Sequence, residues 1–253
     1  MAENLSQLKS DAGWAKANKW AISYADMVTL LLTFFVLLLV ILNEEEKIVE
    51  MEISKLLSET EEVLKKNIRT KIIEIERQDK GVKITLRGNI FPSASNEIKK
   101  GLYPLLTNIG GVTVNAPLFT IFSKDSVTMK KRKTLIKRLR DKNDTLLVEI
   151  RVEGHTDDLP LPKGYEYNNN WELSSARALS MVQLLAQITR LDPSKFSALG
   201  YGEYRPLIDV SQIRDKKERN KARATNRRVE IYLTATVQKK KVNLFDEVEI
   251  NVN

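Results

Sequence analysis

The chain has 253 residues, of which 42% are hydrophobic and 29% charged, a balance typical of a folded protein rather than a disordered one. It contains no cysteine and a single histidine, His155, which excludes disulfides, thiolate metal sites and cysteine nucleophiles. The 41 Lys and Arg residues against 33 Asp and Glu residues give a net charge of +8, a weak indication of anionic partners.

An almost uncharged stretch, residues 20–42, lies near the N-terminus. A helix of this length is roughly 34 Å long at about 1.5 Å per residue, which is enough to cross a bilayer. A cleaved signal peptide would have a shorter apolar core followed by small residues, whereas an asparagine and three glutamates follow here. We therefore expect an uncleaved single span in the cell (inner) membrane. Three lysines before it slightly favour a cytoplasmic N-terminus.

Polar residues interrupt this stretch at helical spacing. Asp26 lies near one end of it, and an ionised carboxylate at mid-bilayer costs about 2.5–3.5 kcal/mol. Ser23, Thr29 and Thr33 share its helix face, because successive spacings are three, three and four residues. One helix cannot enclose an ion path, so this polar stripe predicts partner helices. The alternative is an interfacial Asp that reaches water.

An amphipathic segment follows the span. Val49, Ile53, Leu56, Thr60 and Val63 recur at intervals of four and three residues. This spacing predicts either a short coiled coil or an ordinary amphipathic helix.

The middle of the chain changes character several times. Alternation over residues 82–86 predicts a half-buried strand, residues 102–109 a helix, and the β-branched residues 110–122 a strand and loop. Residues 124–142 carry nine Lys or Arg against two Asp. Because no aromatic residues are interleaved for base stacking, we interpret this run as a helix with a solvated basic face rather than as a nucleic-acid-binding surface.

The C-terminal half alternates strands with helices. Residues 148–152, 196–202 and 229–233 predict strands, and Asn169 with Glu172 resembles a capping box at the start of a helix. This order predicts an α+β fold, an α/β sandwich whose helices cover one face of a sheet.

Two groups of polar residues could carry chemistry. His155 with the acids at 157 and 158 lacks metal-ligand spacing, so we expect no metal site. Asn170 and Arg177 share a helix face near its N-terminal end, where backbone N–H groups favour anions. If Asp157 faces Arg177, the pair would suit a ligand carrying both an ammonium and a carboxylate, although a simple salt bridge between them is equally consistent with the spacing.

Two parts of the chain resemble one family. Within residues 146–235, the segments VEGHTDD, NNNWELSSARA, FSALGYGEYRP and NRRVEIYL resemble the OmpA-like peptidoglycan-binding domain. Within residues 14–42, WAISYADMVTLLLTFFVLLL resembles the single span of MotB-type stator subunits. The combination resembles flagellar MotB-type subunits, which are not enzymes, over nearly the whole chain.

The resemblance implies a division of the chain and its partners. The expected segments are a cytoplasmic N-terminus (1–19), a transmembrane helix (20–42), a plug or linker helix (43–67), an extracytoplasmic OmpA-like domain (68–236) and a polar tail (237–253). The expected assembly is a homodimer within a ring, most simply a pentamer, of MotA-like multi-span subunits. Peptidoglycan and the membrane are the other partners, nucleic acid is not one, and the only cofactor-like species is the translocated proton or sodium ion.

The resemblance also implies roles for single residues. It makes Asp26 the ion-binding residue, and the helix over 44–63 the plug that closes the ion path, with Val49, Ile53 and Leu56 against the membrane or partner. It places the diaminopimelate of a peptidoglycan stem peptide in a groove made by four residues: Asp157, Asn170, Leu173 and Arg177. MotB-like subunits of other ion-driven motors, such as phage-defence motors, share this layout, and a passive OmpA-like wall anchor is a further alternative.

Overall fold

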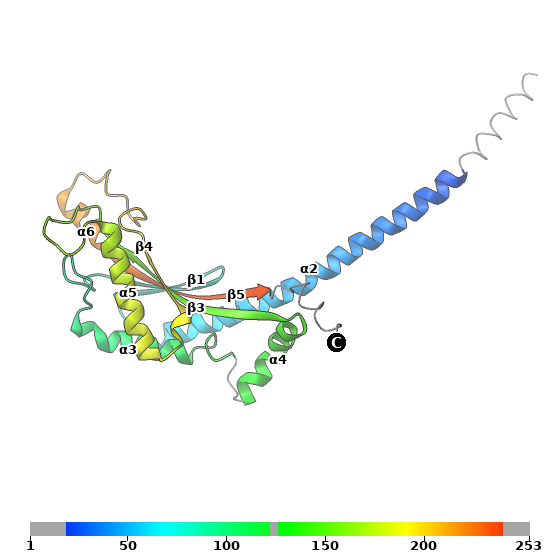
Figure 1. Cartoon of the computed structure of the whole chain (residues 1–253), viewed down its shortest axis with the longest axis horizontal. Helices are drawn as coiled ribbons and strands as arrows, with labels where there is room; N and C mark the ends of the chain where they lie inside the picture. The colour runs from blue at the N-terminus through cyan, green and yellow to red at the C-terminus, as the bar shows by residue number, and fades with distance from the viewer. Residues whose placement is uncertain (1–18, 122–125, 240–253) are drawn as a thin grey trace, which may run out of the picture. The chain divides into compact units, whose positions relative to one another are not determined.

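The computed structural model describes residues 19–121 and 126–239, and the chain divides into two compact units, residues 1–51 and 52–253. The expectations for residues 1–18 and for the tail beyond 239 lie outside the described residues. Figure 1 shows the helices and strands in chain order.

Helix α2 (Lys19–Asn67) begins in the first unit and ends in the second. Its segment Trp20–Ile41 has a mean hydropathy of 2.4 and is not buried. Among the described residues it is the one stretch long and apolar enough to cross a membrane, in agreement with the predicted span.

The last turns of α2 are part of the core of the second unit. Leu57 and Leu64 are fully buried, and the hydroxyl of Thr60 accepts a hydrogen bond from the backbone N–H of Leu118 at 3.0 Å. Residues 52–67 therefore pack with the domain, whereas the sequence suggested that they form a linker outside it.

The second unit is built on a five-stranded sheet in the order β1-β2-β5-β3-β4. All neighbouring strands are antiparallel except β3 and β4, which are parallel. Three of the predicted strands and the one over 82–86 are confirmed, and β1 was not predicted. The strands are β1 (Ile73–Gln78), β2 (Gly81–Arg87), β3 (Asp144–His155), β4 (Phe196–Gly200) and β5 (Arg228–Lys239).

One face of this sheet is apolar and carries helices. Alternate residues of the three central strands are buried there, among them Val82, Ile84, Ile150, Val152, Ile231 and Leu233. Helix α5 (Asn170–Thr189) lies against β3 and β4 and contacts α3 (Tyr103–Asn115) (Figure 1). The predicted α+β sandwich is confirmed. Two single-turn 3-10 helices, η1 (Lys100–Leu102) and η2 (Pro193–Lys195), and helix α6 (Lys216–Asn226) complete the domain.

The predicted strand within residues 110–122 is wrong, because α3 continues to Asn115. Leu106, Ile109 and Thr113 are buried along one side of α3, so packing outweighs the weak helix propensity of its β-branched residues. A Cβ at Gly110 would lie 2.6 Å from Cγ2 of Ile188, so glycine permits the close approach of α3 to α5.

The basic run forms helix α4 (Ser126–Asp141), which contacts β3. Leu135 and Leu139 are buried, while Lys133, Lys137 and Arg140 are exposed. For the side chains that the structure describes, the predicted amphipathic helix with a solvated basic face is confirmed.

Candidate functional site

A cavity of about 570 Å³ lies where β3 ends and α5 begins. The loop after β2 and the residues just before β5 complete its wall. All four residues of the predicted groove line it: Asp157, Asn170, Leu173 and Arg177. These four residues thus lie at one cavity, as the resemblance led us to expect, while their role in binding a ligand stays a prediction.

The start of α5 is fixed by the predicted capping box. The side chain of Asn169 accepts a hydrogen bond from the N–H of Glu172 at 3.0 Å, and the Glu172 carboxylate accepts one from the N–H of Asn168 at 2.8 Å. At Gly154, an added Cβ would lie 2.2 Å from the carbonyl oxygen of Ser174. This glycine lets the end of β3 pack closely against the first turns of α5.

Asn170 ties the turn after β3 to α5. Its side-chain amide donates to the carbonyl oxygens of Asp157 at 3.3 Å and Leu159 at 3.0 Å, and to the carboxylate of Glu203 at 2.8 Å. The amide is therefore engaged by the protein itself, and Asn170 positions the backbone that carries Asp157.

Arg177 holds the opposite wall of the cavity. Its guanidinium donates to the carbonyl oxygens of Ser95 at 2.9 Å and Pro92 at 3.2 Å and lies 5.0 Å from the centre of the Phe91 ring. Burial lowers the pKa of Arg177 to about 10, while the nearby Asp157 opposes this shift, so the side chain is cationic at neutral pH.

Asp157 does not pair with Arg177 among the described ion pairs. Its carboxylate accepts a hydrogen bond from Arg227 at 2.6 Å, and it is largely buried, with 11% of its side chain exposed. The neighbouring Asp158 pairs instead with Arg223 at 2.6 Å, outside this cavity, and that hydrogen bond lowers the pKa of Asp158. Sequence reasoning missed Arg227, although it stands in the segment NRRVEIYL that carried the resemblance.

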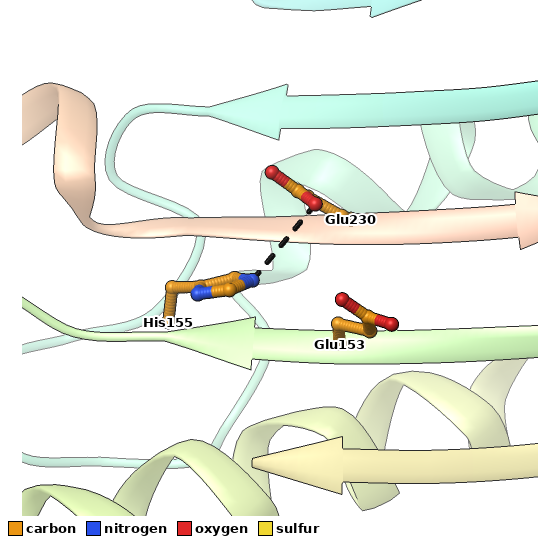
Figure 2. Close-up of side chains that lie close together, drawn as sticks. All are labelled: Glu153, His155 and Glu230. Atoms are coloured by element: carbon orange, nitrogen blue, oxygen red, sulfur yellow. Dashed lines mark ion pairs between the residues drawn. The ribbon is translucent and has the colours of Figure 1, made fainter. Parts of the chain in front are cut away.

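A buried polar cluster lies on the other face of the sheet from α5. Glu153 and His155 of β3 face Glu230 of β5, with ligand-type atoms within 4.8 Å of one another (Figure 2). Both oxygens of Glu230 are already engaged, by Arg228 at 2.6 Å and by the Tyr232 hydroxyl at 2.6 Å. The three residues could reach one cation, but the adjacent guanidinium already neutralises the carboxylate of Glu230, which disfavours a further positive charge.

In this cluster, only His155 has buried polar atoms that make no hydrogen bond. Its ring nitrogens are buried without a hydrogen-bond partner, and the nearer one is 3.9 Å from Glu230. Burial, reinforced by the charge of Arg228, lowers the pKa of His155 to about 4. The imidazole is therefore neutral at pH 7 and stacks on Tyr201 with the ring centres 5.4 Å apart.

The polar stripe lies along the apolar part of α2. Thr29 donates to the carbonyl oxygens of Ala25 at 3.0 Å and Asp26 at 2.8 Å, and Thr33 donates to that of Leu30 at 2.9 Å. Both hydroxyls donate their hydrogen bonds within their own helix. They can therefore face lipid or a partner helix without leaving a hydrogen-bond donor unpaired. Ser23 lies on the same helix, three residues before Asp26.

The residues predicted for the plug are buried. Val49 is 8% exposed, and Ile53 and Leu56 are 8% and 4% exposed, the latter two within the second unit. In this arrangement Ile53 and Leu56 contribute to a protein core. Their role in closing an ion path stays a prediction.

Comparisons with known proteins agree on both parts of the chain. The family described as "Membrane MotB of proton-channel complex MotA/MotB" matches residues 7–58, and the OmpA family matches residues 121–221. The uncharacterized protein YtxE of Bacillus subtilis is 26% identical over 86% of this chain and 88% of its own length. Motility protein B of the same organism is 29% identical over 72% of this chain and 56% of its own length. The crystal structure of a putative MotB-like protein from Desulfovibrio vulgaris, 18% identical, covers 74% of this chain and 99% of its own with a TM-score of 0.52, which shows a shared fold.

Proposed function

We propose that this chain is a MotB-type stator subunit, which conducts ions, is anchored by its OmpA-like domain and converts ion-motive force into flagellar torque; matches to a MotB family over residues 7–58 and to the OmpA family over residues 121–221 support this. Its partner in this role is a MotA-like multi-span subunit, arranged as a ring around a dimer of this chain. The N-terminus faces the cytoplasm and the OmpA-like domain lies outside the membrane. The family is one of motor and anchor subunits rather than of enzymes, and the transported species is a proton or a sodium ion.

The observation that carries this proposal is the position of Asp26 within the apolar segment Trp20–Ile41. An ionised carboxylate in the membrane is expensive, so its presence is best explained by a role in ion transfer. Binding of a proton or sodium ion would cancel its charge, and release would restore it. Each change of charge would alter the relative stability of two partner conformations and so couple ion flow to movement.

The cavity in the second unit supports the anchoring half of the proposal. Asp157 provides an anion and Arg177 a cation in one cavity of about 570 Å³. Such a pair complements a ligand that carries an ammonium and a carboxylate, as the diamino acid of a peptidoglycan stem peptide does. A stator fixed to the wall in this way can push against a rotor.

The decisive experiment replaces Asp26 by asparagine in cells that contain the partner subunit. Asparagine nearly keeps the size and hydrogen bonding but cannot ionise, so insertion should be undisturbed. We expect normal incorporation of fluorescently tagged stators but no torque on a tethered bead. Asp26→Glu, which keeps the charge and moves it by about one methylene, should retain part of the torque.

The same experiment separates an active stator from a passive wall anchor. A passive anchor needs no intramembrane charge, so full torque from incorporated Asp26→Asn stators would refute the ion-conducting role. Incorporation is scored in every cell that is measured, so that loss of assembly is not mistaken for loss of ion flow.

A further inference from the structure

The charges that line the cavity do not balance. Among the described residues that line it, Asp157 is the only carboxylate, whereas Lys99, Arg177 and Arg227 are three cations. A fourth, Arg228, is already neutralised by the buried carboxylate of Glu230 at 2.6 Å. A ligand with one ammonium and one carboxylate would leave this excess of positive charge unchanged.

In the free groove, Arg227 occupies the carboxylate that an ammonium would need. The distance between the Arg227 guanidinium and the Asp157 carboxylate is 2.6 Å, and 43% of the Arg227 side chain is exposed against 11% for Asp157. The guanidinium can therefore swing aside and stay hydrated, while the carboxylate cannot. Replacement of one cation by another on Asp157 avoids leaving a desolvated charge unpaired.

Arg177 is held in place, which distinguishes it from Arg227. Two carbonyl oxygens of the loop after β2 accept its hydrogen bonds, and it lies against the Phe91 ring. One cation of the groove is thus fixed, and another can be displaced. Both are guanidinium groups, whose planar fork suits carboxylates better than a lysine ammonium does.

We propose that Arg227 is a displaceable second cation that selects the acidity of the wall peptide. The ligand's ammonium takes over Asp157, and the released Arg227 then binds a second carboxylate of the same ligand. The groove accordingly prefers stem peptides whose carboxylates are free over stems in which they are amidated. This inference rests on the proposed wall-binding function and specifies its ligand.

The test uses the full chain in detergent micelles and two synthetic stem peptides. Both peptides carry one side-chain ammonium and one free carboxylate for Arg177, and they differ only in whether their second carboxylate is free or amidated. Calorimetry should show at least about tenfold tighter binding of the free form, because hydrogen bonds between charged groups are the stronger ones. Arg227→Gln should reduce this preference to about threefold or less. Part of the reduction should come from tighter binding of the amidated peptide, because its ammonium no longer has to displace Arg227 from Asp157.

Arg140→Gln is the matched control, because Arg140 is an exposed arginine on α4 away from the cavity and its removal changes the net charge equally. It should keep the full preference. Thermal melting verifies that each variant is folded, and Arg227→Met removes the same charge should glutamine disturb the fold.

Three results would overturn the inference. If the wild type binds both peptides with equal affinity, selection by acidity is refuted, while the proposed wall-binding function is supported. An undiminished preference in Arg227→Gln or Arg227→Met assigns the selection to another cation. Binding of neither peptide refutes the proposed wall-binding function, and the inference with it.

Discussion

The integration of the last turns of α2 into the second unit can be tested through two leucines. Leu57 and Leu64 are both fully buried, and they lie seven residues apart on one face of the helix. If residues 52–67 belong to the folded domain, shortening either side chain to alanine leaves a cavity in its core. If they are instead a separate linker, the same changes leave the domain untouched.

The expected loss follows from the burial. A buried Leu→Ala substitution typically costs about 2–5 kcal/mol, the sum of the lost transfer energy and the cavity left behind. For a unit of this size, about 1 kcal/mol corresponds to roughly 2–4 °C in melting temperature. A loss of about 3 kcal/mol would therefore lower the melting temperature of each variant by about 6–12 °C.

The assay is thermal unfolding of the full chain in detergent, with the unfolding monitored by near-ultraviolet circular dichroism. Met51→Ala is the control, because Met51 lies one turn or more before the same leucines and 62% of it is exposed. It should shift the melting temperature by no more than about 2 °C. If the melting temperatures of Leu57→Ala and Leu64→Ala equal that of Met51→Ala, the packing of α2 on the domain is refuted.

Three further predictions concern the wall groove, acid stability and the plug. Arg177→Ala should cost about 2–5 kcal/mol of binding to purified wall sacculi, and unchanged retention by the folded variant would contradict its assignment. Since the pKa of His155 lies near 4 in the fold and near 6.5 when unfolded, the unfolded chain binds the proton first as pH falls. About 3 kcal/mol of stability should therefore be present above pH 6.5 and be lost between pH 6.5 and 4, a loss that melting curves should show to be smaller in His155→Gln. Deletion of residues 44–51, which removes Val49 but spares the turns of α2 that pack with the second unit, should make cells with the partner subunit leak ions and grow slowly. An intact growth rate and no leak would leave this segment a simple stalk.

Much of the fold could be predicted from periodicity, because each correct element has a regular pattern of its own. The strands at 82–86 and 148–152 alternate strictly, and the capping box marks where α5 begins. The strand β1 was missed although Ile73 and Ile75 alternate with glutamates, because no glycine or proline separates it from the preceding helix. A short strand without such a boundary is difficult to distinguish from a continuing helix.

The errors at the site have a different origin. The four groove residues could be placed together from the resemblance, but the partner of Asp157 could not, because Arg227 comes from the other end of the domain sequence. The carbonyl oxygens that hold Arg177 also leave no mark in the sequence, since every residue has one. Such contacts depend on the path of the loop after β2, which local patterns do not specify.

The groove lies at one end of the longest strand pairing in the described part of the chain. The β3–β5 ladder runs from Asp144 opposite Lys239 to His155 opposite Arg228, and Asp157 and Arg227 each lie just past its last rung. A ligand held between these two residues pulls on both central strands at the same end and in the same direction. Such a pull does not slide β3 against β5, so the two strands move as one body and their hydrogen bonds are not opened one at a time.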